Sequence, residues 1–441
     1  MVITAKFGGS SLADAGQFRK AAEIIKSNSA RRYVVASAPG RRFSGDVKVT
    51  DLLLKCYELS AENGDIAGTF AAIEERFNGI ILDLKLDLSL EKEFEKIRTF
   101  VLSDAGRDYV ASRGEYLNSL ILAKVLGYDF IDAKSAVFFR EDGTLDEERT
   151  NRVLGGLLRE HERAVVPGFY GSMPNGTIKT FSRGGSDISG SIVARASGSD
   201  LYENWTDVSG MLMADPRCVK DPRPIEEITY QELRELSYMG ATVMHEDAIF
   251  PVRKAGIPIN IRNTNRPQDK GTMIVPRPRG GKCGPITGIA GSTGYSVINI
   301  EEDMMNNQIG YGRRVLSVLE NHHISFEYLP SGIDTLSVVL KTSVLEPARE
   351  AVIADLYDVV SPDAVSIYDD LAIIAVVGRG MVRTEGTAAR IFQALANARI
   401  NIRMIDQGSC ELNIIIGVEA KHYEAALNAI YRVFTEKETS V

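Results

Sequence analysis

Short apolar strands alternate with longer amphipathic helices from residue 1 to about residue 275, and this alternation constrains the fold more than any other feature of the chain. Strands separated by helices are joined by crossover connections, which produce a largely parallel sheet with helices on both faces. The sequence therefore predicts an α/β fold in this region. The expected strands are 33–37, 164–168, 178–181, 202–206 and 258–262, and the expected helices are 50–61, 114–126, 186–196 and 230–238.

The C-terminal part of the chain contains an internal repeat, separated from the first region by a linker of Pro, Gly and basic residues (276–285). The stretch that starts at Gly312 resembles the one that starts at Gly386, and from Arg314 and Arg390 onwards the two match at an offset of 76, since Ile324 matches Ile400 and 400 − 324 = 76. Glycine, basic and apolar positions all keep this register, so a chance match is the weaker explanation. Each copy is expected to form strand, helix, strand, turn, strand and helix, giving two small α+β sandwiches.

Composition narrows the classes of partner. The 441 residues carry a formal net charge of 51 − 59 = −8, which argues against a general nucleic-acid-binding surface. The four cysteines are scattered and form no CxxC pair, so we expect reduced thiols rather than disulfides or a zinc site. Neither a signal peptide nor a membrane-spanning run is evident. These features predict a cytoplasmic protein with no nucleic-acid or membrane partner.

The first strand ends in a glycine-rich turn, residues 6–11 (KFGGSS). The consecutive glycines Gly8 and Gly9 leave the backbone free of side chains, so that N–H groups at a following helix start could receive an anion. Lys6 would then neutralise charge on a transferring phosphoryl group. The turn matches neither the Walker loop nor the GxGxxG fingerprint. A plain structural turn is the alternative to a phosphate site.

A second turn of this kind occupies residues 180–191 (TFSRGGSDISGS). A strand ends, Arg183 follows, and Gly-Gly-Ser-Asp leads into a helix. The planar guanidinium matches a carboxylate bidentately, although a solvated arginine beside a helix cap made by Ser186 or Asp187 is the alternative. Two such turns, one led by Lys6 and one by Arg183, suit an enzyme that holds nucleotide phosphates beside a small carboxylic acid.

Other polar positions have a structural and a functional explanation. Thr206 and Asp207 end a predicted strand, where they could touch nucleotide or metal. The turn 215–217 (DPR) carries a carboxylate and a cation, and an internal ion pair in a surface turn would explain it equally well. Thr50 is a candidate helix cap. Glu115 lies in the first turn of a predicted helix, where the helix dipole alone explains a carboxylate.

Taken together, these motifs resemble those of the aspartate kinase family, within the amino acid kinase superfamily, and the C-terminal repeat resembles the paired ACT regulatory domains of that family. The resemblance covers essentially the whole chain. It implies an αβα sandwich around a mainly parallel sheet, followed by two α+β ACT-type domains. The matching segments are 6–11, 49–51, 114–115, 181–187, 206–208 and 214–217. The expected domains are a kinase domain at 1–280, a first ACT domain at 286–370 that could also take the chain end 420–441, and a second ACT domain at 371–419.

The resemblance implies Mg-ATP-dependent phosphorylation of the side-chain carboxylate of L-aspartate to 4-phospho-L-aspartate, the first step toward lysine, threonine and methionine. The cofactors implied are ATP and Mg²⁺, with the metal held by phosphates and water more than by protein, so no metal-ligating residue is expected. Lys6 would stabilise the transferred phosphoryl group, Arg183 would bind the α-carboxylate, and Glu115 would meet the ammonium group and help orient Lys6. The expected catalytic residues are Lys6, Arg183 and Asp187; those at aspartate are Ser10, Thr50, Glu115, Arg183 and Ser186; those on the nucleotide side are Lys6, Gly8, Gly9, Ser10, Thr206, Asp207, Asp215 and Arg217.

Three positions depart from the family pattern. Thr242 stands where the family often has a lysine near the nucleotide, Leu212 where it often has a tyrosine, and Cys410 where it usually has a serine. None of these changes removes a charge that acts directly on the reacting groups.

The resemblance also implies feedback regulation by an end-product amino acid, with lysine as first choice and threonine as second, read by a homodimer formed through the ACT domains or by a tetramer. Glu327 and Asp334 favour a cationic effector. A dimerisation module without ligand is the alternative. The expected effector residues are Met305, Gln308, Tyr311, Gly312, Phe326, Glu327, Ser331 and Asp334.

Rival functions are a kinase acting on glutamate, N-acetylglutamate or UMP, and a catalytically silent amino-acid sensor. Glu115 and Arg183 together favour a free amino acid with both α groups charged, and the intact Lys6 and Arg183 turns argue against a silent protein. A dehydrogenase lacks its fingerprint, and no fused homoserine dehydrogenase is expected from the length of the chain.

Overall fold

The computed structural model describes residues 1–103, 106–182, 184–241, 244, 246–278 and 284–435, with Glu246 and Asp247 described by their backbone alone. The chain divides into two compact units. The first unit comprises Met1–Met211, Pro224–Tyr230 and Val243–Arg279, and the second comprises Leu212–Arg223, Gln231–Thr242 and Gly280–Val441. Two segments of the predicted kinase domain 1–280 thus cluster with the second unit. The predicted domain boundaries stay predictions.

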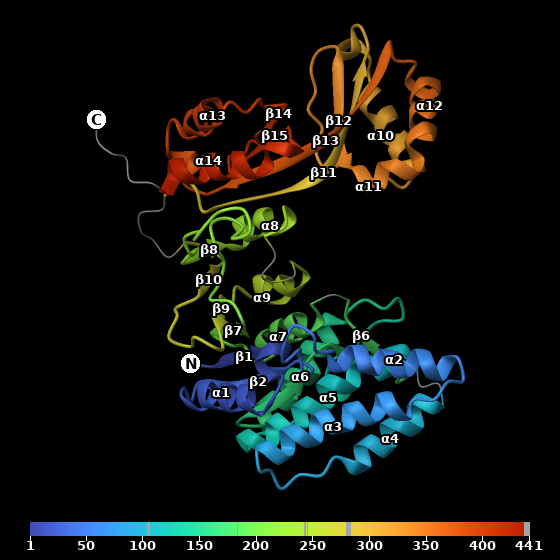
Figure 1. The fold of residues 1–441 in the computed structure, drawn as a ribbon, viewed down its shortest axis with the longest axis vertical. Helices are drawn as coiled ribbons and strands as arrows, with labels where there is room; N and C mark the ends of the chain where they lie inside the picture. Colours follow the sequence, from blue (N-terminus) through green and yellow to red (C-terminus); the bar gives the residue numbers. More distant parts are fainter. Residues whose placement is uncertain (104–105, 183, 242–243, 245, 279–283, 436–441) are drawn as a thin grey trace. The chain divides into compact units, whose positions relative to one another are not determined.

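The first unit is built on an eight-stranded sheet of order β3-β4-β2-β1-β7-β9-β10-β8 (Figure 1). Neighbouring strands from β3 to β9 are parallel; β10 is antiparallel to β9 and parallel to β8. The strands are β1 (Ile3–Phe7), β2 (Arg31–Ala36), β3 (Asp129–Phe130), β4 (Ala164–Pro167), β7 (Leu201–Thr206), β8 (Glu227–Thr229), β9 (Ile259–Asn263) and β10 (Thr272–Val275), and a separate hairpin pairs β5 (Tyr170–Ser172) with β6 (Ile178–Thr180).

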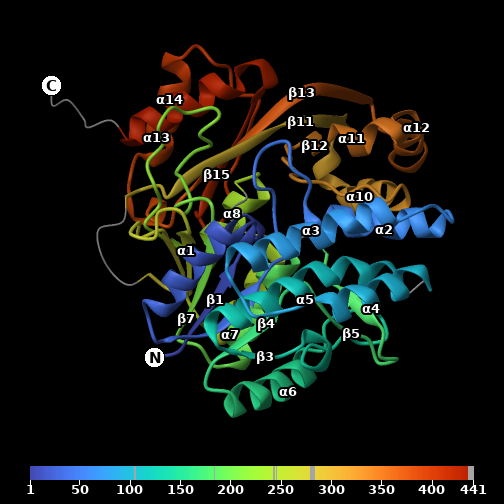
Figure 2. The same cartoon turned by 60° about the horizontal axis from the view of Figure 1, so that its bottom comes forward.

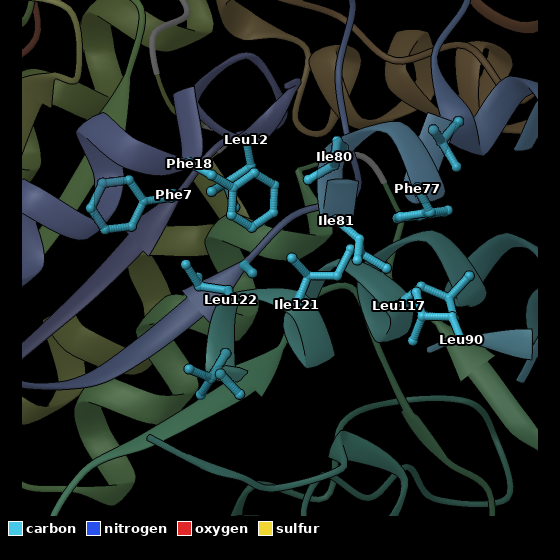
Figure 3. Packing of buried hydrophobic residues seen from close by; sticks show 14 of the residues in the cluster. Phe7, Leu12, Phe18, Phe77, Ile80, Ile81, Leu90, Leu117, Ile121 and Leu122 are labelled. Atoms are coloured by element: carbon cyan, nitrogen blue, oxygen red, sulfur yellow. The ribbon is translucent and has the colours of Figure 1, made fainter. Parts of the chain in front are cut away.

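Helices cover the two faces of this sheet, so the α/β fold with a mainly parallel sheet is confirmed. Phe7 of β1, Val34 of β2 and Trp205 of β7 share one buried cluster with residues of α1 to α5. Figure 3 shows part of this cluster, with Phe7 of β1 near Phe18 of α1. The alternate residue Thr4 of β1 instead forms a hydrogen bond with Ser199, three residues after the end of α7, so α7 lies on the other face. The helices of this unit are α1 (Ala15–Lys26), α2 (Val49–Ala61), α3 (Ala67–Asp83), α4 (Glu91–Leu102), α5 (Arg107–Leu126), α6 (Glu147–Glu160), α7 (Gly185–Ala196) and α9 (Phe250–Ala255). The helix α8 (Tyr230–Tyr238) belongs to the second unit from Gln231 onwards.

The second unit is built on a five-stranded antiparallel sheet of order β12-β11-β13-β15-β14. Two 14-residue strands, β11 (Gly288–Glu301) and β13 (Ala364–Val377), run side by side through its centre (Figure 2). The other strands are β12 (Thr335–Lys341), β14 (Met404–Asp406) and β15 (Asn413–Glu419). Both long strands run from the β12 side of the sheet to the β15 side. The expected boundary between the two ACT domains, at 370/371, therefore falls inside β13.

The structure confirms the internal repeat. β13 follows β11 at an offset of 364 − 288 = 76, and α13 (Thr387–Asn397) follows α10 (Tyr311–Asn321) at 387 − 311 = 76. Each copy has its own core: α10 and α12 (Arg349–Val360) pack in one cluster, and α13 and α14 (Tyr423–Thr435) in another. A short helix, α11 (Thr342–Leu345), follows β12. Within the described ranges, no helix is both long and apolar enough to cross a bilayer.

Candidate active site

Lys6 forms a buried ion pair at the C-terminal end of β1. Its Nζ lies 2.6 Å from Oδ1 of Asp187, which is in the first turn of α7. Asn204 of β7 contacts both partners: its Oδ1 accepts from Lys6 Nζ at 3.4 Å, and its Nδ2 donates to Asp187 Oδ1 at 3.0 Å. Only 6% of Lys6 is exposed, so water screens its charge weakly. The structure thus brings the predicted catalytic residues Lys6 and Asp187 together.

The first glycine turn packs backbone against backbone. The N–H of Gly8 donates to the carbonyl of Trp205 at 2.9 Å, and that of Gly40 donates to the carbonyl of Gly9 at 2.9 Å. A Cβ added to Gly9 would lie 2.9 Å from the carbonyl oxygen of Ala38, so no other residue fits there without displacement. The turn enters a short 3₁₀ helix (Gly9–Leu12) containing the half-buried Ser10, and α1 begins only at Ala15. A helix therefore follows the glycine turn, first as this 3₁₀ helix and then as α1.

The second glycine turn does lead directly into an α-helix. Gly184 caps α7 with φ of +73°, a left-handed conformation that favours glycine. The half-buried Ser186 and Asp187 follow in the first turn of α7. A Cβ on Gly168 would lie 2.9 Å from the Ser186 hydroxyl. Arg183, the predicted ligand of the α-carboxylate, lies outside the described residues.

Glu115 is a buried carboxyl group in the interior of α5, which begins at Arg107, so its predicted place in the first turn is wrong. It is 6% exposed, and its Oε2 has no hydrogen-bond partner among the described residues. Burial raises the pKa of Glu115 to about 8, although a hydrogen bond from the backbone of Ala38 and the positive charge of Arg113 both act to lower it. Lys6 forms its ion pair with Asp187. Among the described residues, Glu115 takes part in no ion pair. A carboxyl group with a free acceptor and a raised pKa suits an incoming cation.

The other predicted residues of this unit occupy loop and helix-end positions. Thr50 lies half-buried in the first turn of α2, but Lys48 is the N-cap, so the prediction of Thr50 as cap is wrong. Thr206 ends β7, and its hydroxyl donates to the exposed Asp207 at 3.3 Å. The carbonyl of Thr206 accepts from the N–H of Thr264 at 2.9 Å.

Asp215 and Arg217 belong to the second unit and pair with each other. The Arg217 guanidinium contacts both carboxylate oxygens of Asp215, at 3.0 Å and 2.5 Å. The hydrogen bonds from Arg217 hold the pKa of Asp215 below its ordinary value. This is the internal ion pair that the structural explanation of the turn requires. The nucleotide role of both residues stays a prediction.

Sequence reasoning missed two groups of residues around the site. Asn204 was not predicted, although it lies directly opposite Lys6 in the β1–β7 register. Arg76 of α3 was also missed: its guanidinium donates to the Asp46 carboxylate at 2.6 Å and to the carbonyl of Gly40 at 3.3 Å. It therefore ties the loop after β2 to α3. Only the tertiary structure reveals these contacts, because no sequence motif marks them.

The predicted effector residues divide into two groups along β12. The N–H of Asn306 donates to the carbonyl of Ile333, and that of Met304 to Asp334 Oδ1, so the loop carrying Met305 and Gln308 packs beside the turn of Ser331 and Asp334. Tyr311, 3% exposed, begins α10 and has no partner for its hydroxyl among the described residues; Gly312 follows it.

Phe326 and Glu327 form the second group, further along the same strand. Ser331 of the first group pairs with Leu336 of β12. The N–H of Glu327 donates to the carbonyl of Val339, three residues further along the same strand. The two groups are therefore about 10 Å apart along β12. Glu327 accepts a hydrogen bond from the hydroxyl of Tyr238, which ends α8.

Comparison with known proteins places this geometry in a family. The amino acid kinase family model matches residues 1–263, and an ACT domain model matches residues 374–434. Aspartokinase 3 of Bacillus subtilis is 39% identical over 444 residues, covering 97% of this chain and 98% of that protein. The crystal structure of Clostridium acetobutylicum aspartate kinase aligns with a TM-score of 0.90 at 46% identity, covering 98% of this chain and 100% of that one.

A more distant structural neighbour is Escherichia coli aspartokinase III, solved in complex with aspartate and ADP and also with lysine and aspartate. The two structures have TM-scores of 0.75 and 0.73 at 22% and 23% identity, each covering 99% of this chain and 100% of the other. At this identity the likeness establishes the fold alone. The chain belongs to the amino acid kinase family, as an aspartate kinase with a C-terminal ACT domain.

Proposed function

We propose that the chain phosphorylates the side-chain carboxylate of L-aspartate with Mg-ATP, producing 4-phospho-L-aspartate in the cytoplasm as the first step toward lysine, threonine and methionine. The observation that carries the proposal is the buried ion pair of Lys6 and Asp187 beside the Gly8–Gly9 turn. A cation that is already desolvated and oriented stabilises charge developing on a transferred group without reorganisation. The Escherichia coli neighbour was solved with aspartate and ADP, which supports these substrates.

The residues fit a phosphorylated nucleotide at this turn. Lys6 supplies a positive charge on this segment, and Gly9 lets the turn pack against the backbone of Ala38 and Gly40. ATP would supply the phosphoryl group. In the described part of the chain, no group of three or more His, Cys, Asp or Glu side chains could hold a metal ion. Mg²⁺ would then be held by phosphate and water oxygens.

The nucleophile would be the substrate's own carboxylate, ionised at pH 7, so the chain needs no general base. Its task is to position that carboxylate in line with the phosphoryl group. We assign the α-carboxylate to Arg183, the ammonium group to Glu115, and neighbouring contacts to Ser10, Thr50 and Ser186. The free, buried Oε2 of Glu115 supports this assignment, since an ammonium group would satisfy it.

We also propose that the second unit senses an amino acid and forms a dimer. The lysine bound in the Escherichia coli neighbour supports lysine as the first choice of effector. Threonine stays the second choice. The carboxylates of Asp334 and Glu327 would favour the cationic side chain of lysine. A bound lysine would bridge the two groups of predicted effector residues.

The test is a hydroxylamine trap for acyl phosphate, with ATP, magnesium and each candidate acid. Aspartate should give a hydroxamate and glutamate far less, because one extra methylene moves the nucleophile off line, which can cost roughly a hundredfold. Equal turnover of glutamate, or no product from aspartate, would overturn the proposal.

A further inference from the structure

Asn204 lies opposite Lys6 on the neighbouring strand, where the sheet itself fixes its position. The parallel register of β1 and β7 pairs Lys6 with Asn204 and Phe7 with Trp205. Because side chains alternate along a strand, Asn204 shares the face of Lys6 and Asp187, whereas Trp205 joins the core on the opposite face. Asn204 is 3% exposed. A buried amide of this kind costs free energy unless it is hydrogen-bonded.

The Asn204 amide is hydrogen-bonded to both members of the ion pair. Its oxygen faces the Lys6 amine at 3.4 Å, and its nitrogen donates at 3.0 Å to Asp187 Oδ1, the same oxygen that Lys6 contacts at 2.6 Å. The dipole of the amide is thus aligned with the ion pair. Its two partners, one cation and one anion, define which end is oxygen.

β7 holds Asp187 at a second point. The hydroxyl of Tyr202, two residues before Asn204 on the same face, donates to the main-chain carbonyl of Asp187 at 3.2 Å. The ring passes so close to α7 that a Cβ on Gly190 would lie 2.4 Å from this hydroxyl. Tyr202 therefore fixes the backbone of Asp187 and Asn204 fixes its carboxylate. The pairing of β1 with β7 is made by their backbones and does not require either of these side-chain contacts with Asp187.

We propose that Asn204 is a positioning residue for the phosphoryl transfer: it shares the carboxylate of Asp187 with Lys6 and so holds the Lys6 amine beside the glycine turn. This inference rests on the proposed function of Lys6. The amine lies next to that turn, since a Cβ on Gly8 would be 3.4 Å from Nζ. Without the amide, the Asp187 carboxylate loses the hydrogen bond from Asn204 and interacts with Lys6 alone. The Lys6 amine then moves with this carboxylate, away from the phosphoryl group.

Three variants test the proposal. Asn204→Leu keeps the approximate shape and removes both hydrogen bonds. Asn204→Asp places a second carboxylate against Asp187, so mutual repulsion raises the pKa of the pair; when protonated, the new side chain again offers one donor and one acceptor. Asn260→Leu is the matched control, because Asn260 is a buried asparagine of β9 paired with Glu203, and therefore on the opposite face of the sheet from Lys6.

The readouts are kcat, the KM for aspartate, and the melting temperature, between about pH 5.5 and about pH 8.5. Asn204→Leu should lower kcat roughly tenfold or more with little change in the KM for aspartate, whereas Asn260→Leu should keep kcat within about twofold even if its melting temperature falls. For Asn204→Asp, the ratio of its kcat to that of the wild type should rise as the pH falls and the new carboxyl group gains a proton. A purely structural role produces no such pH-dependent recovery.

A kcat of Asn204→Leu within about twofold of Asn260→Leu, or a flat pH ratio for Asn204→Asp, would overturn the proposal. If Asn204→Leu does not fold, the pH profile of Asn204→Asp decides alone. An inactive wild-type protein would refute the proposed function itself, and this inference with it.

Discussion

Lys6 Nζ and Asp187 Oδ1 lie 2.6 Å apart although 181 positions separate the two residues in the chain. β1 presents the amine and the first turn of α7 presents the carboxylate. Their meeting places one partly compensated cation at the glycine turn, where the proposed function needs a charge that stabilises the transferred phosphoryl group. The predictions below follow from this pair and from the groups around it.

The charge of Lys6 should act mainly in the transition state. Lys6→Ala is expected to lower kcat by roughly a hundredfold or more with a smaller effect on substrate binding, because its charge matters most as the phosphoryl group moves. Steady-state kinetics with aspartate and ATP would measure this. A kcat within about threefold of the wild type would show that the turn is only structural.

Arg183 should act on the substrate's α-carboxylate. Arg183→Ala is expected mainly to raise the KM for aspartate and also to lower kcat through lost orientation. Arg183→Lys should not restore activity, since a point charge cannot make a two-pronged contact. Full rescue by lysine would contradict bidentate binding.

Glu115 should release a proton when aspartate binds. Its pKa of about 8 means that most molecules carry the proton at pH 7, and an incoming ammonium group lowers that pKa. Titration calorimetry in buffers of different ionisation enthalpy should therefore show up to about one proton released per aspartate near pH 7, less above pH 8, and none in Glu115→Gln. Proton uptake would contradict the assignment.

The same group sets a pH dependence of stability. The folded pKa of Glu115 lies above the ordinary value of 4.5, so its contribution is fully present below about pH 4.5 and is lost as the pH rises toward about 8. Glu115→Gln should flatten that part of the pH–stability curve, as measured by urea unfolding at several pH values. An unchanged slope would show that Glu115 is not buried as a neutral acid.

Arg76 should hold the loop after β2 in place. It donates to Asp46, and the charge and hydrogen bonds of Arg42 and Arg76 hold the pKa of Asp46 well below its ordinary range. Arg76→Leu should lower the free energy of unfolding by about 1–3 kcal/mol, since it leaves buried acceptors unpaired. The exposed pair of Arg98 and Glu74 offers the control: Arg98→Ala should cost less than about 1 kcal/mol. Equal losses would contradict the assignment.

Effector binding should be reciprocal with substrate binding. If lysine bound to the second unit weakens aspartate binding through roughly 1–3 kcal/mol of coupling, aspartate must weaken lysine binding by the same factor. Calorimetric titrations of lysine and threonine, with and without saturating aspartate, would measure this. Binding of neither ligand, or binding that changes neither affinity nor rate, would leave only a dimerisation module.

Much of the fold could be predicted from local pattern. α8 spans the expected residues 230–238, and the 76-residue repeat recurs in β11 and β13. The glycine turns were visible because glycine marks close backbone approach, as Gly9 shows. The single sheet of the second unit was not predicted, because the length over which β11 and β13 pair depends on tertiary contacts rather than on strand propensity.

The contacts within the site could not be predicted in the same way. Asn204 reaches Lys6 only through the register of β1 and β7, across 198 positions of sequence. Whether Glu115 stays charged depends on burial by segments far from α5 in the chain. Helix starts were also uncertain: Thr50 has the chemistry of a cap, but Lys48 occupies that position without a side-chain hydrogen bond.

The most direct test of the central claim is to identify the carboxyl group that becomes phosphorylated. Incubation with ATP, magnesium and aspartate, followed by borohydride, reduces an acyl phosphate to an alcohol. If Arg183 and Glu115 hold the α groups while Lys6 stabilises transfer to the side chain, the product is homoserine. Recovery of 3-amino-4-hydroxybutanoate, the product expected from phosphorylation of the α-carboxyl group, or of unchanged aspartate, would contradict the account.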